Sequence, residues 1–227
     1  MSFIKKTAEF WSLLSGRVTI RLESTPIDSV ALLTEFATTK AAFVAQKTLY
    51  GYLKTRMGTR YPTMFEDMVF VDSINIAKLH AYGGCLSDLS VYVVAYALQH
   101  LPKDDPLRNS IARQIFETGL ANNKEQVSSI EEFSAAEALV EFDLRLRDTT
   151  WTDASAGRAN FKHSAKTIIT WAPIAPQLKQ YDAGVVRNSV MFAWHGIRER
   201  LTRRHRRFRR PDRAAQEERH HGRARSL

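Results

Sequence analysis

The chain has 227 residues, of which 44% are hydrophobic and 25% are charged, with a single cysteine and a formal net charge of +9. One cysteine forms no internal disulfide, so a disulfide-stapled secreted scaffold is excluded and we expect a cytoplasmic protein. Apolar runs are shorter than the roughly 18–20 residues of a transmembrane helix, so we also expect no membrane span.

The positive charge is concentrated at the C-terminal end. Residues 198–227 hold twelve arginines, no lysine and four acidic residues, whereas residues 1–197 are nearly neutral. We therefore predict a globular body over residues 1–197 and an arginine-rich tail over residues 198–227. A body of this size buries a substantial core as one domain without disulfide or metal support.

The first 25 residues predict two short elements. Apolar residues between positions 3 and 14 indicate a short amphipathic helix that ends at Gly16. Residues 17–22 alternate between polar and apolar, which is the period-two pattern of a half-buried strand. No partner strand is evident, so this stretch is either one short strand or a connector.

Two long helical segments are predicted next, over about residues 26–57 and 65–100. Thr25 is a favourable N-cap for the first, and Pro26 suits the first helical position. The second contains the adjacent glycines 83 and 84. Each costs about 1 kcal/mol relative to alanine inside a helix, so the pair indicates a kink, a break or a close backbone approach. Because the connection is short, we predict that the two segments pack on each other.

The rest of the body is also predicted to be helical. Asp105 can cap one helix, and Ser134 with Glu137 forms a capping box for another. The sequence thus predicts an all-α, single-domain helical bundle. Its further elements are helices over about 106–120 and 135–146, a loop over 148–160, a short helix over 161–171, and a final helix from about 177 into the tail.

The final helix carries its apolar stripe into the tail. Trp194, Ile197, Leu201 and Phe208 keep helical spacing, so we predict helix to about residue 210 and disorder beyond Pro211. Arginine binds phosphate through a planar fork, so we expect nucleic acid, anionic lipid or an acidic protein as partner. A solvated tail is the alternative. The predicted polyanion-binding residues are Arg198, Arg200, Arg203, Arg204, Arg206, Arg207, Arg209 and Arg210.

The body carries no familiar catalytic or metal-binding motif, and we expect neither a cofactor nor a metal. Around the glycine pair, residues 80–88 place an imidazole, a thiol, a hydroxyl and a carboxylate close in sequence, so the candidate catalytic residues are His80, Cys85 and Ser87. In an intact helix, His80 and Ser87 lie about 10 Å apart along the axis. Only a bend would join them; otherwise His163 or His195 must supply the imidazole. The alternative is that Cys85 and Ser87 are packing residues.

Segments 27–36, 46–62 and 65–78 resemble a family of small uncharacterised bacterial helical proteins, some of them catalogued as esterases. The resemblance covers about residues 1–197, not the tail, and carries over no catalytic motif. Two hypotheses follow. The first is a non-enzymatic interaction or accessory protein whose basic C-terminal segment contacts polyanions or acidic partners. The second is an esterase-type hydrolase with an unconventional nucleophile at Ser87 or Cys85. A straight packed helix at the glycine pair favours the first, and a bend within a pocket favours the second.

Overall fold

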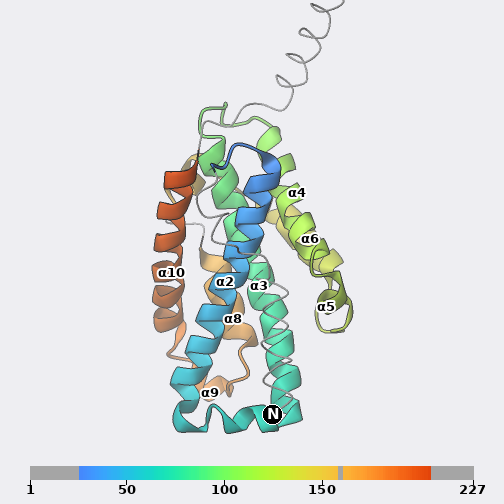
Figure 1. Cartoon of the computed structure of the whole chain (residues 1–227), viewed down its shortest axis with the longest axis vertical. Coiled ribbons are helices and arrows are strands. Elements are labelled where there is room, and N and C mark those ends of the chain that lie inside the picture. The colour runs from blue at the N-terminus through green and yellow to red at the C-terminus, as the bar shows by residue number, and fades with distance from the viewer. Residues whose placement is uncertain (1–25, 158–160, 206–227) are drawn as a thin grey trace, which may run out of the picture.

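Helix α3 (Met68–Ala97) lies at the centre of the fold and is surrounded by other helices (Figure 1). In this computed structural model, which describes residues 26–157 and 161–205, every α3 residue from 81 to 95 is buried. Because this stretch is mostly apolar and holds only Ser87, Asp88 and Ser90 as short polar side chains, it presents no continuous polar face to water, which explains its central position. Its neighbours are α2 (Val30–Met57), α4 (Leu107–Ala121), α6 (Ala135–Arg147), α7 (Trp151–Ala156) and α8 (Lys162–Trp171).

The long helices α2 and α3 pack side by side in opposite directions (Figure 1). The predicted all-α bundle with two long packed helices is therefore confirmed. Two short 3-10 helices, η2 (Gly58–Arg60) and η3 (Thr63–Glu66), turn the chain between them. Gly58 has φ +57°, a conformation that glycine adopts without the steric cost of a Cβ, and it ends α2.

Three of the helix starts with side-chain hydrogen bonds bear on the predicted caps, and one of them requires a correction. Helix α2 begins at Val30 rather than near Pro26, because the hydroxyl of Ser29 accepts the N–H of Leu32 at 3.4 Å. The other two predicted caps are confirmed. The Asp105 carboxylate accepts the N–H of Leu107 at 3.0 Å, and the Ser134 hydroxyl accepts the N–H of Glu137 at 3.2 Å.

The predicted loop over residues 148–160 is wrong, because it contains α7. Trp151 anchors this six-residue helix by burying its ring beneath the guanidinium of Arg108, and Gly157 ends it with φ +76°. The short helix predicted over 161–171 is confirmed as α8. The described part of the chain also contains α5 (Lys124–Ser128), α9 (Pro176–Lys179) and α10 (Ala183–Arg204).

Helix α10 ends earlier than its apolar stripe predicts. At His205 the backbone is extended (φ −67°, ψ 120°), and the helix therefore stops at Arg204 instead of continuing to about residue 210. The N–H of Ile27 donates to the carbonyl of Arg204 at 2.8 Å, and Ile27 pairs with His205 in a parallel bridge. Ile27 and Leu201 are both fully buried. The packing of α10 against the body therefore continues through residues 198–205.

Some predictions lie outside the described residues. They are the short helix and strand before residue 25, and the tail beyond His205, with Arg206, Arg207, Arg209 and Arg210. Among residues 26–157 and 161–205, no helix combines the length and the apolar character needed to cross a membrane.

Candidate functional site

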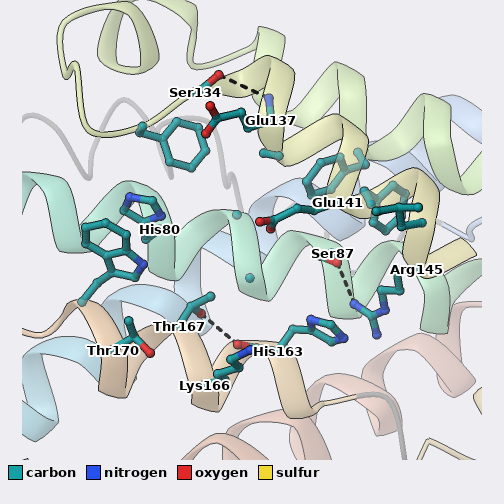
Figure 2. A pocket seen from close by; sticks show the side chains of 18 of the residues that line it. His80, Ser87, Ser134, Glu137, Glu141, Arg145, His163, Lys166, Thr167 and Thr170 are labelled. Carbon is teal, nitrogen blue, oxygen red and sulfur yellow. Dashed lines mark hydrogen bonds between the residues drawn. The ribbon is translucent and has the colours of Figure 1, made fainter.

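A pocket of about 620 Å³ opens between α3, α6 and α8. Each helix contributes residues spaced three and four apart, so each turns one face toward it. Figure 2 shows this arrangement, with α3 as the floor and α6 and α8 as opposite walls. The volume lies within the range of about 300–1,000 Å³ typical of small-molecule sites.

The floor of the pocket is the glycine pair. Helix α3 passes through both glycines without a break, and the two neighbouring elements lie close against them. A Cβ on Gly83 would touch the Phe133 ring at 3.5 Å, and one on Gly84 would collide with the Thr167 side chain. Of the three alternatives, the close backbone approach is therefore confirmed.

A buried ionic network closes one end of the pocket. The Asp88 carboxylate is completely buried on α3, and Arg145 of α6 forms an ion pair with it at 2.8 Å. The second Asp88 oxygen accepts the backbone N–H of Ser164 at 2.8 Å and its hydroxyl at 2.5 Å. Because Ser164 lies in the first turn of α8, this carboxylate caps a helix from another part of the chain. Arg145 also donates to the Ser87 hydroxyl at 2.6 Å.

The other end of the pocket is aromatic. The His80 ring stacks on Trp171 with centroids 3.5 Å apart and planes 2° apart, and Phe133 meets His80 nearly edge-on at 5.1 Å. We call these three residues the aromatic corner. A backbone carbonyl can only accept, so the 3.0 Å contact between His80 Nε2 and the Glu132 oxygen places a hydrogen on Nε2. Burial lowers the pKa of His80, which leaves it neutral at pH 7.

His163 lies at the same end of the pocket as Ser87 and Arg145 (Figure 2). Desolvation lowers the pKa of His163, and the nearby positive charge of Arg145 lowers it further. His163 is therefore neutral at pH 7 and able to accept a proton. His80 and Ser87 both line the pocket, but they remain seven residues apart on a continuous helix.

The other candidate residues lie elsewhere. Cys85 is completely buried in the core, and burial raises the pKa of its thiol, which keeps it protonated. That environment suits a packing residue better than a nucleophile. His195 lies on the surface of α10, 3.2 Å from Glu199.

The described arginines of the predicted polyanion site have different surroundings. The guanidinium of Arg198 lies over the Phe161 ring at 5.9 Å and packs against Gly157, and that of Arg204 lies over Phe36 at 5.6 Å. Arg203 faces Glu199 at 3.6 Å. Arg198 and Arg204 thus serve the packing of α10, while Arg200 and Arg203 are exposed.

Three pocket features escaped the sequence analysis. Arg145 and Trp171 were not singled out, because their partners lie 57 or more residues away in the chain. The polar residues of α6 and α8 recur at intervals of three and four residues in the sequence, and this spacing is the signal that identifies a polar face on each helix.

Comparison with protein-family models, curated proteins and solved structures finds no match for this chain. The resemblance to bacterial proteins catalogued as esterases therefore stays a prediction. Within residues 26–157 and 161–205, no group of three or more His, Cys, Asp or Glu side chains is arranged to hold a metal ion.

Proposed function

We propose that this protein is a non-enzymatic binding protein that holds a small molecule in the pocket between α3, α6 and α8. The observation that carries the proposal is the pocket itself, a cavity of about 620 Å³ that has an aromatic end and a polar end. Sites for small molecules combine these elements, because aromatic faces supply contact area and a few polar groups fix orientation.

The buried network supports a preformed site. Arg145, Ser87 and Asp88 are held by mutual bonds, so their positions do not depend on a ligand. A ligand that enters such a site loses little free energy to protein reordering.

The test is a thermal-shift screen of charged and uncharged aromatic and aliphatic compounds against the full chain. A ligand at one hundred times its Kd stabilises by about 2.7 kcal/mol, which corresponds to about 5–10 °C in Tm for a chain of this size. The blocking variant is Ala138→Trp, which fills the pocket from α6. The matched control is Val140→Trp, whose position on the same helix is 61% exposed and outside the pocket lining. Ligand shifts should disappear in the first variant and persist in the second, and equal shifts in both would contradict the proposal.

An esterase-type hydrolase is the second candidate, and it is favoured by the position of His163. Ser87 receives a hydrogen bond from Arg145 at the same end of the pocket as the neutral His163. In this reading, the Ser87 hydroxyl attacks the ester carbonyl while His163 takes its proton and Arg145 stabilises the oxyanion. The ester C–O bond then breaks, and the alcohol leaves with the proton from His163. Water, deprotonated by His163, finally attacks the acyl group on Ser87 and releases the acid.

The hydrolase is tested by the turnover of p-nitrophenyl acetate and butyrate by the full chain. Ser87→Ala and His163→Gln should each abolish turnover while the protein still folds, whereas Cys85→Ala should remain active. Turnover that survives Ser87→Ala, or a wild-type rate equal to that of buffer, would remove this candidate.

A further inference from the structure

The aromatic corner offers π faces within a partly enclosed site. Phe133 is buried, whereas Trp171 is 36% exposed and lines the pocket, so the indole is the most accessible of the three rings. Its third ring, His80, is neutral and therefore adds no positive charge. A positive group placed over such rings is attracted by their negative faces, and the attraction grows as water is excluded.

Carboxylates face this corner from α6. Glu137 and Glu141 lie one turn apart on the pocket side of the helix, and Figure 2 shows Glu137 next to the aromatic end and Glu141 over the middle. Within the described residues, neither carboxylate has an ion-pair partner. Glu132, just before this helix, also lines the pocket.

The positive groups of the pocket do not balance these carboxylates. Arg145 is engaged by Asp88 and Ser87 at the opposite end. Lys166 is exposed on the α8 wall, and both histidines are neutral. The three glutamates that line the pocket therefore leave it with an excess of negative charge, and Glu137 lies next to the aromatic end.

We propose that the ligand is an organic cation, an amine or quaternary ammonium group on a compact apolar body, whose charged group lies in the aromatic corner beside Glu137. This inference rests on the proposed binding function and specifies its ligand class. The polar end, about 10 Å away along α3, provides Ser87, His163 and Lys166 as hydrogen-bonding groups for the rest of the ligand. An anionic ligand is disfavoured, because it would place its charge near Glu137 and Glu141 and would find Arg145 already paired.

The experiment compares probes of matched shape and different charge. Choline and benzyltrimethylammonium are the cations, 3,3-dimethyl-1-butanol is the uncharged isostere of choline, and benzoate is the anion. Each is titrated into the full chain at fixed ionic strength, with Trp171 fluorescence and ligand-observed NMR as readouts. Because the chain has four tryptophans, Trp171→Phe identifies the signal of this residue. We expect the cations to bind about tenfold more tightly than the isostere and benzoate.

Variants separate the contribution of charge from that of shape. Glu137→Gln keeps the size of an exposed side chain and should weaken cation binding up to about fivefold, with no effect on the isostere. Glu131→Gln removes an exposed carboxylate outside the pocket lining and should leave binding unchanged. Trp171→Phe should retain most of the affinity, whereas Trp171→Leu should lose it.

The two proposals fail in different ways. Equal binding of choline and its uncharged isostere, stronger binding of benzoate, or an unchanged cation affinity in Glu137→Gln would overturn the cation inference while leaving a ligand pocket in place. Ligand shifts that Ala138→Trp does not abolish would instead overturn the binding function itself.

Discussion

The buried ion pair between Arg145 and Asp88 allows a stability prediction. Asp88 is completely buried and the Arg145 side chain is 12% exposed, so Arg145→Met leaves a carboxylate in the core without its counter-charge. Removal of one partner from a buried pair costs about 3–5 kcal/mol. Because Asp88 keeps both hydrogen bonds from Ser164, we expect the lower end, about 3 kcal/mol.

The assay is urea unfolding followed by circular dichroism at pH 7, in which a lower midpoint at constant slope reports lost stability. The same loss lowers the Tm by about 6–12 °C for a chain of this size. The matched control is Arg113→Met. Arg113 bridges Asp143 and Glu117 on the surface at 45% exposure, and exposed pairs contribute about 0–1 kcal/mol.

A double variant separates charge from packing. Asp88→Asn should recover part of the stability lost in Arg145→Met, because it removes the unpaired charge while its amide oxygen still accepts from Ser164. If Arg145→Met costs no more than Arg113→Met, or if Asp88→Asn adds its full cost to the Arg145→Met background, the electrostatic account of this network is wrong.

Three further predictions concern packing, pH and the tail. Gly84→Ala should destabilise the protein by about 1–3 kcal/mol, because the added Cβ collides with Thr167. Gly51→Ala should instead stabilise it by up to about 1 kcal/mol, because the space around Gly51 is open. Equal Tm values for the two variants would contradict this account. The pKa of His80 is lower in the folded protein than in the unfolded chain, so the stability that its neutral form contributes is complete above about pH 6.5 and is lost as the pH falls toward the folded-state pKa. Between pH 7 and pH 5, the urea midpoint should therefore drop less in His80→Gln than in the wild type. The full chain should bind a labelled oligonucleotide with a log affinity that falls with log salt at a slope of about −4 to −5, and deletion of residues 206–227 should remove this binding without lowering the Tm. Deletion from residue 198 should instead unfold the body, because Leu201 leaves the core. A flat salt response in fluorescence anisotropy would show that the tail does not bind polyanions.

The fold follows from local patterns where those patterns are long or strongly capped. The apolar spacing of α2 and α3 and the caps at Asp105 and Ser134 predicted the helices that the structure contains. Helix α7 was missed because six residues are too few for a helix to be stable alone, and it forms only where Trp151 is buried in the core.

The site could be predicted only in part, because its contacts are distant in sequence. The sequence predicted His80 and Ser87 as candidate catalytic residues, with His163 as an alternative source of the imidazole. It did not predict that Asp88 would cap α8, since that bond joins residues 76 apart. The end of α10 was missed for the same reason, because Ile27 meets Arg204 from the opposite end of the described chain.

The shared bonding of Asp88 has a consequence for how the walls of the pocket can move. One carboxylate joins both walls of the pocket to the floor, through Arg145 of α6 and Ser164 of α8. Separating the walls there would strand a buried charge at a cost of several kcal/mol. The opposite end is held by ring stacking at His80 and a hydrogen bond to a backbone carbonyl, which are weaker restraints. The distance between the two walls should therefore vary more at the Trp171 end than at the Asp88 end.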